Sequence, residues 1–171
     1  TASHNPSKYN GYKVYGADGC QITSAAATAI SQEIENVDVF TEVKRMCLVQ
    51  AKEQGLVSNI GEDVYTAFIE KVKGQSVLGK TAVDKDIAIV YSPLNGSGLK
   101  PVMRALQESS FTNITIVKEQ EQPDGNFPTC PYPNPEIKEA LTLGIKYAKE
   151  NKADILIATD PDSDRVGVAI K

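Results

Sequence analysis

The sequence predicts an α/β domain built on a mainly parallel sheet. From residue 86 onward, short β-leaning apolar runs at residues 86–92, 113–117 and 153–159 alternate with two stretches of helical period. Strand, helix, strand, helix, strand is the order of consecutive βαβ units. A further apolar run at residues 166–170 follows directly. Ligands of such sheets bind beyond the carboxyl ends of the strands, and two polar loops, residues 93–98 and 160–165, fall at those ends.

The two intervening helices have recognisable starts. Residues 99–109 form the first, with Pro101 tolerated in its first turn. Asn134 is predicted to cap the second, with Pro135 at its first position. The apolar face of this second helix recurs with nearly helical spacing at Ile137, Ala140, Leu141, Gly144, Ile145 and Ala148.

The first half of the chain is less regular. A short strand is expected at residues 11–16, and Thr23 is expected to cap a helix that runs to Ile34. Residues 35–61 have no clean period, and the apolar residues at 37–40 are expected to be extended, in a connection between two packing units. After Gly61 a helix is predicted that ends before Gly74.

Composition narrows the class of protein. The 171 residues are 41% hydrophobic and 23% charged, which is typical of a soluble globular protein. The net charge of −4 and the lack of a basic patch argue against a nucleic-acid partner, and no apolar run is long enough to span a membrane. Three widely spaced cysteines predict neither a disulfide framework nor a zinc site, so a cytoplasmic protein is expected. The first residue is not Met, and we expect the sequence to be a piece of a longer chain.

Three aspartates at alternate positions, Asp160, Asp162 and Asp164, follow the strand at residues 153–159 and precede Arg165. Carboxylates this close repel one another, and a hard divalent cation such as Mg²⁺ would remove the repulsion. The alternative is a hydrated acidic turn. An EF-hand calcium loop is excluded, because Arg165 stands at its glycine position and Lys171 at its closing glutamate position.

Other candidate residues are ambiguous on their own. Ser3 precedes His4, the single histidine, but neighbours in sequence do not make a catalytic pair, so an ordinary turn is the simpler interpretation. Lys13 is either a solvated residue or one that points back to this loop. The glycines of residues 93–98 could hold a phosphate, but no Gly-Lys-Ser/Thr follows, which favours a tight turn from strand to helix. Residues 122–133 form a long irregular loop without an assignable role.

Taken together, these motifs resemble the α-D-phosphohexomutases, the phosphoglucomutase/phosphomannomutase family, and most of all its bacterial phosphoglucomutase branch. Residues 1–15 are similar to the family's active-serine loop, and residues 160–165 to its metal loop. Residues 93–98, and 124–129 with 133–136, match intervening landmarks in the right order, so the resemblance covers nearly the whole chain.

The resemblance implies a three-layer α/β/α domain with a mainly parallel sheet at residues 41–171. Before it, residues 1–40 would be the end of a similar first domain that carries the active serine. The family's third and fourth domains, which recognise the sugar and its phosphate, would be missing partners of this chain. We therefore expect the piece to be inactive alone.

The resemblance also implies a mechanism. Ser3 would be a phosphoserine that exchanges its phosphoryl group with a sugar phosphate through a sugar 1,6-bisphosphate. One Mg²⁺ would be bound by Asp160, Asp162, Asp164 and an oxygen of Ser3. Lys13 would be the general acid and base, while His4 and Arg165 would contact phosphate. Ser163 stands where the family often has Ala or Gly, and no consequence is expected.

The substrate stays open. Glucose, mannose, a pentose or an amino sugar would each fit, because the discriminating loop is not in this sequence. Two interpretations from other classes remain beside the mutase. One is a metal-dependent phosphatase that loses the Ser3 phosphate to water, and the other is a non-catalytic α/β module that binds a cation.

Overall fold

The structure is a computed structural model that describes residues 3–79 and 81–171. Thr1 and Ala2, which belong to the predicted active-serine loop, lie outside the described residues. The chain divides into two compact units, one formed by the residues up to Tyr12 together with Thr66–Lys171, and the other by Lys13–Tyr65. None of the helices in the described part of the chain is both long and apolar enough to cross a membrane.

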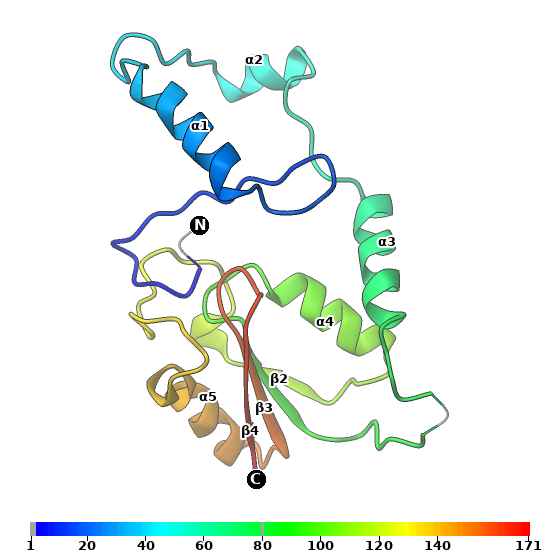
Figure 1. Ribbon diagram of the computed structural model, residues 1–171. Helices are drawn as coiled ribbons and strands as arrows, with labels where there is room; N and C mark the ends of the chain where they lie inside the picture. Colours follow the sequence, from blue (N-terminus) through cyan, green and yellow to red (C-terminus); the bar gives the residue numbers. More distant parts are fainter. Residues whose placement is uncertain (1–2, 80) are drawn as a thin grey trace. The chain divides into compact units, whose positions relative to one another are not determined.

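The larger unit contains a four-stranded sheet (Figure 1). Its strands are β1 (Ile89–Ser92), β2 (Ile114–Ile116), β3 (Ile155–Thr159) and β4 (Val166–Ile170), in the spatial order β2-β1-β3-β4. β1 pairs in parallel with β2 and β3, and β4 pairs antiparallel with β3. The predicted strands and the mainly parallel sheet are therefore confirmed.

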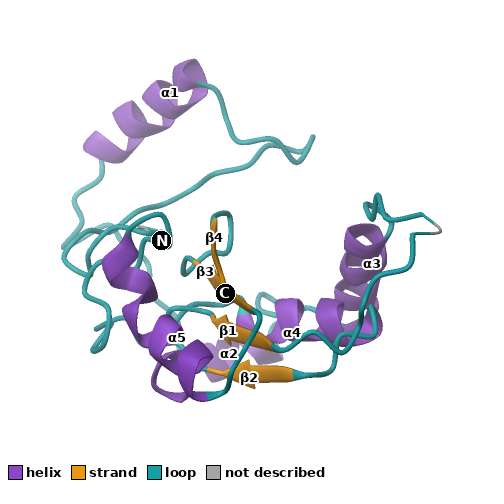
Figure 2. Ribbon diagram, turned by 90° about the horizontal axis from the view of Figure 1, so that it is seen from below, coloured by secondary structure: helices purple, strands orange, loops and turns teal. Residues whose placement is uncertain are grey.

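Helices cover both faces of this sheet. α4 (Leu99–Glu108) follows β1, and α5 (Lys138–Glu150) precedes β3. In Figure 2 the strands lie between α5 on one side and α4 on the other. A short 3-10 helix, Lys118–Gln120, follows β2. This arrangement is the predicted α/β/α layering.

The core lies mainly between α5 and the sheet. Val90 and Leu156 are almost fully buried there, and Leu141 and Ile145 of α5 pack against them. A second cluster joins Leu94, Cys130, Ala140 and Ala158, with Ile137 and Leu141 packed against it. Burial of this kind stabilises the unit by about 25 cal/mol per Å² of apolar surface removed from water. The same two clusters hold the ends of β1 and β3, where the candidate site lies, in a fixed position.

The regular structure of the smaller unit is mainly helical, and loops make up the rest. Thr23 caps α1 (Ser24–Glu35) as predicted, by accepting a hydrogen bond from the Ala26 N–H at 3.4 Å. α2 (Leu48–Glu53) was not predicted, and α3 (Glu62–Lys73) begins after Gly61 and ends before Gly74 as predicted. The boundary between the two units falls within α3.

Three local predictions are wrong. The expected strand at residues 11–16 is reduced to one antiparallel bridge between Tyr15 and Gln21. Residues 37–40 are not extended, because the Asp38 side chain accepts the Phe40 N–H and closes a turn. Asn134 does not cap α5.

The Asn134 side chain accepts the N–H of Glu136, and its carbonyl accepts that of Ile137, so it closes a separate turn. Ile137 then returns to an extended conformation, and α5 begins at Lys138.

Candidate functional site

The carboxylate loop, residues 160–165, joins the end of β3 to the start of β4. Asp160 is fully buried, Asp162 is half-buried and Asp164 is exposed, yet one oxygen from each lies within 4.8 Å of the others. Hydrogen bonds close the loop: the Ser163 N–H donates to the Asp160 carbonyl at 3.0 Å, and the Arg165 N–H donates to Asp160 Oδ1 at 3.0 Å. The loop therefore gathers three carboxylates at one point.

Ser3 meets this loop from the other end of the sequence, within the same unit. Its hydroxyl oxygen lies 2.6 Å from Asp160 Oδ2 and 2.7 Å from Asp162 Oδ1. The Ser3 backbone has a φ of 55°, in the left-handed region that non-glycine residues seldom adopt. This backbone conformation costs free energy, and the surrounding structure keeps Ser3 in it.

The charge balance of this contact calls for either a proton or a cation. A hydroxyl carries one hydrogen, so it donates to one carboxylate oxygen at a time. The second short oxygen–oxygen contact then needs a proton on a carboxyl group or a positive ion beside it. Burial raises the pKa of the Asp160 carboxyl, while hydrogen bonds from Ser3 and the Arg165 backbone oppose that rise. The donor set consists of hard oxygen atoms, which suits Mg²⁺ or Mn²⁺.

His4 and Arg165 lie near the carboxylates but make other contacts. His4 Nδ1 is 3.3 Å from Ser3 Oγ, so the imidazole flanks the hydroxyl. The Arg165 guanidinium forms an ion pair with Glu136 at 2.8 Å, while its backbone N–H holds Asp160. The predicted phosphate contacts of both side chains stay predictions.

Lys13 belongs to the smaller unit, whereas the three carboxylates belong to the larger one. Its predicted role as general acid and base stays a prediction.

Sequence reasoning did not identify the residues that support the carboxylate loop. The 93–98 loop, at the end of β1, contacts it directly: Ser97 donates two hydrogen bonds to the Pro161 carbonyl. Behind it, the hydroxyl groups of Tyr91 on β1 and Thr159 on β3 are hydrogen-bonded at 3.0 Å in the core. The one available signal was that Gly96 and Gly98, like the three aspartates, follow a predicted strand, so that both loops were expected at the same edge of the sheet.

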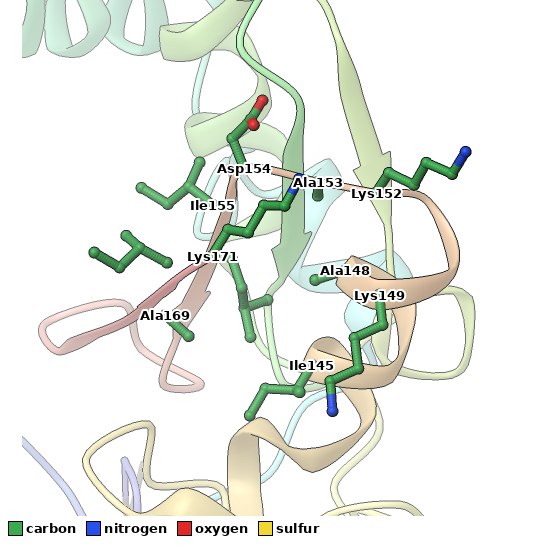
Figure 3. A pocket seen from close by; sticks show the side chains of 11 residues that line it. Ile145, Ala148, Lys149, Lys152, Ala153, Asp154, Ile155, Ala169 and Lys171 are labelled. Carbon is green, nitrogen blue, oxygen red and sulfur yellow. The ribbon is translucent and has the colours of Figure 1, made fainter.

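A hollow of about 340 Å³ lies elsewhere, between α5 and the two strands β3 and β4 (Figure 3). Apolar side chains, including Ile145 and Ala169, line it, and Lys149 and Lys171 lie at its margin. It is beside the start of β3 and the end of β4, at the opposite end of these strands from the carboxylate loop. It is therefore separate from the candidate site.

Comparison with known proteins places this geometry in a family context. The family model described as phosphoglucomutase/phosphomannomutase, alpha/beta/alpha domain II, matches residues 63–171, and the model of domain I matches residues 1–39. The exact division predicted between residues 40 and 41 stays a prediction.

Relatives match along almost the whole chain. A Staphylococcus saprophyticus phosphoglucomutase is 35% identical over 98% of the chain, and a Saccharomyces cerevisiae phosphoribomutase is 38% identical over 100%. A phosphomannomutase of Mycoplasmoides pirum is 32% identical over 100%. The chain spans about 30% of the length of these relatives.

The fold is also similar to that of solved structures from the same family. A crystal structure of a phosphoglucomutase/phosphomannomutase family protein from Burkholderia thailandensis superposes with a TM-score of 0.68. It is 24% identical, and the match covers 99% of this chain and 32% of that one. Because the domain II model alone matches residues 63–171, more than half of the sequence, this chain belongs to the phosphoglucomutase/phosphomannomutase family.

Proposed function

We propose that this chain is the phosphoserine- and metal-bearing part of a phosphohexomutase that interconverts hexose 1-phosphate and hexose 6-phosphate. The observation that carries the proposal is the contact of the Ser3 hydroxyl with Asp160 and Asp162, at 2.6 and 2.7 Å across more than 150 residues of sequence. A serine that only closed a turn would have no reason to lie between two carboxylates of a distant loop. The family membership supports the same assignment.

In this proposal Asp160, Asp162 and Asp164, with an oxygen of Ser3, hold one Mg²⁺. When bound, the ion supplies positive charge that neutralises phosphate oxygens. The chain's residues supply positioning: the turn at Ser3 and the closed carboxylate loop fix the phosphorylated oxygen at the end of the parallel strands. Phosphoryl transfer depends mainly on such positioning and on charge neutralisation.

The proposed transfer conserves the phosphoryl group. The bond between phosphorus and Ser3 Oγ breaks as a bond to a sugar hydroxyl oxygen forms, which gives a sugar 1,6-bisphosphate. The hydroxyl proton leaves to a general base, for which we propose Lys13. In the return step Ser3 Oγ, left without a proton by the first transfer, forms a bond to the phosphorus of the other phosphate. The bond from that phosphorus to its sugar oxygen breaks, and Lys13 gives its proton to that oxygen. His4 lies 3.3 Å from the Ser3 oxygen, and we propose that it donates a hydrogen bond to the phosphate on Ser3.

The test uses the whole protein that contains this chain. After incubation with glucose 1,6-bisphosphate, we expect the intact mass to rise by one phosphoryl group, which peptide mapping assigns to Ser3. Ser3→Ala abolishes both the added mass and the mutase activity. Ser7→Ala is the matched control, because Ser7 is an exposed serine of the same loop that contacts no carboxylate in the described interactions.

The fate of the phosphoryl group on Ser3 separates a mutase from a phosphatase. A mutase transfers phosphate from Ser3 to glucose 6-phosphate, whereas a phosphatase releases it as free phosphate. Full activity of Ser3→Ala would overturn the proposal and favour a non-catalytic cation-binding module. If Ser3→Ala is inactive, competition between glucose, mannose and ribose phosphates identifies the sugar. These three are chosen because the relatives are a phosphoglucomutase, a phosphomannomutase and a phosphoribomutase.

The proposed substrate, partner domains and cellular compartment follow from the same assignment. The substrate is a small sugar phosphate, and the remaining domains of the parent chain are proposed to bind it. The three cysteines are unpaired, which fits a reducing cytoplasm. Turnover by the 171-residue chain alone is not expected.

A further inference from the structure

The 93–98 loop is bound to the start of the carboxylate loop. The N–H and the hydroxyl of Ser97 both donate to the Pro161 carbonyl oxygen, at 2.8 and 3.0 Å. That carbonyl belongs to the peptide unit that links Pro161 to Asp162. Fixing its orientation therefore fixes the backbone between the first and second carboxylates.

Gly96 lets the two loops approach this closely. A Cβ atom at Gly96 would lie 2.2 Å from Pro161 Cα and 2.5 Å from Pro161 O, closer than any van der Waals contact. The φ of Gly96 is not in the left-handed region, so the backbone conformation alone does not require glycine here. Glycine is required because no side chain fits between this position and the Pro161 backbone.

Gly98 makes the same kind of approach to the other side of the loop. A Cβ atom there would lie 2.4 Å from Ser163 Oγ and 2.8 Å from Thr159 Oγ1. The contacts therefore reach both the start of the carboxylate loop and its centre, from a neighbouring parallel strand. Like-charged carboxylates would otherwise relax apart when no cation separates them.

We infer that Gly96 and Ser97 are positioning residues that set the cation affinity of the Asp160–Asp164 cluster. In this inference neither residue is a cation ligand or a substrate contact. They act by holding the Pro161 peptide, so that the three carboxylates are already gathered before a cation binds, and less free energy is spent on ordering them. This inference rests on the cation site proposed above.

The experiment measures cation binding directly, without an activity assay. The 171-residue chain is titrated with Mn²⁺, a hard cation that the same ligands accept, and free Mn²⁺ is followed by electron paramagnetic resonance. Gly96→Ala is expected to raise the dissociation constant about tenfold or more, because the added methyl group displaces the Pro161 backbone. Ser97→Ala keeps the N–H donor and loses one exposed hydrogen bond, so a rise of about two- to fivefold is expected.

Controls keep the test decisive. Gly125→Ala is the matched glycine variant, because a Cβ there meets nothing within 4 Å and its φ is ordinary, and it should bind Mn²⁺ like the wild type. Amide spectra of each variant report whether it folds. If Gly96→Ala fails to fold, Ser97→Ala still decides, because the Ser97 side chain is exposed and makes no core contact. Its expected second readout is faster hydrogen exchange at the Ser97 and Arg165 amides in the metal-free chain.

The outcomes distinguish the two hypotheses. If the wild type binds one Mn²⁺ and Ser97→Ala binds it equally well with unchanged amide exchange, the positioning role is wrong while the cation site stands. Asp162→Asn removes one of the proposed cation ligands. If the wild type binds no Mn²⁺, or binds it no more tightly than Asp162→Asn does, the cation site itself is wrong, and the inference fails with it. Weakened binding in both loop variants, with Gly125→Ala unchanged, supports the inference.

Discussion

A single hydroxyl and a single buried carboxyl dominate the site at the scale of residues. Asp160 is fully buried at the end of a core strand, where the loss of hydration raises its pKa and makes its charge costly. The Ser3 hydroxyl and the Arg165 N–H offset part of that cost. Either a proton on the carboxyl group or a bound cation would remove the remaining cost.

Ser163 carries a cost that was not expected from the sequence. Its φ of 61° lies in the left-handed region, where glycine is favoured. Its hydroxyl oxygen is buried, and no hydrogen-bond partner is found for it among the described residues. The serine therefore contributes strain and an unsatisfied oxygen to the centre of the carboxylate loop.

Tyr91 gives a prediction about pH. Burial raises the pKa of its phenol from 10.0 to about 12. Above pH 10 the unfolded chain loses the phenolic proton while the folded chain keeps it, so the folded state binds more protons and its stability falls as pH rises from about 10 to about 12. The loss attributable to Tyr91 is about 2–3 kcal/mol, from a shift of about two units.

Urea unfolding of the chain and of Tyr91→Phe, between pH 8 and pH 12, measures this loss. At pH 8 the variant should be less stable by about 1–3 kcal/mol, because Thr159 loses its buried partner. The gap between the two proteins should close as pH rises. Tyr132→Phe, at an exposed tyrosine, should keep the wild-type profile. A gap that stays constant up to pH 12 would contradict the prediction.

At the scale of elements, the sequence predicted the sheet of the larger unit and the helices α1, α3 and α4, but it misplaced the start of α5 and missed α2. The strands of the larger unit were found because apolar runs between turn residues leave few alternatives. The start of α5 was misplaced, since the Asn134-Pro135 pattern that often opens a helix here closes a separate turn. α2 was missed because six residues with one buried side chain, Ala51, leave almost no periodic signal.

The candidate site was predictable only in part. The alternate spacing of the three aspartates, together with the family resemblance, led to the carboxylate cluster, which the structure brings together. The support from Gly96 and Ser97 depends on two loops that are far apart in sequence meeting at one sheet edge. No local pattern encodes a backbone approach of that kind, because it follows from the pairing of β1 with β3.

The packing of α5 on β3 gives a prediction at this scale. Gly144 is buried in α5, and a Cβ atom there would lie 2.7 Å from Leu156 Cδ1. Gly144→Ala gains about 1 kcal/mol of helix propensity but overpacks the core, which costs about 1–3 kcal/mol. We expect a net loss of stability, of up to about 2 kcal/mol, in urea unfolding.

Leu156→Val tests the mechanism, because it removes the methylene that brings the leucine tip to Gly144. Alone it should destabilise the chain by about 1 kcal/mol through the space it leaves. In the double variant the alanine methyl fills that space, so the two losses should not add. Additive losses would mean that the cost of Gly144→Ala arises elsewhere than at the contact with Leu156.

At the scale of the whole molecule, the two units differ in how much they bury. The larger unit has a core in which β1 is buried throughout and β3 is buried in part. Ala51, in contrast, is the single buried hydrophobic residue described in Lys13–Tyr65. Phe40 is 94% exposed and Ile60 is 83% exposed, so the smaller unit leaves much of its apolar surface in water. A unit with so little burial has little free energy to set against the entropy of ordering its chain.

Hydrogen exchange should therefore divide the chain at the unit boundary. α1 has 12 residues and buries none of them, whereas α5 has 13 and buries Ala140 and Gly144. Isolated helices of this length are marginal in water, so the α1 amides should exchange within seconds to minutes, while those of α5 and β3 are protected by the global stability of the larger unit. Peptide-level exchange followed by mass spectrometry measures both helices in one sample.

Equal protection of α1 and α5 would contradict this difference, unless α1 gains burial by association between copies of the chain. Repeating the measurement over a range of dilutions decides between these explanations, because protection from association falls with concentration and protection from folding does not. Exposed apolar side chains on α1 itself, Ile30 and Ile34, are the place where such association would begin. Substituting both with Lys should then remove the concentration dependence and leave the exchange of α5 unchanged.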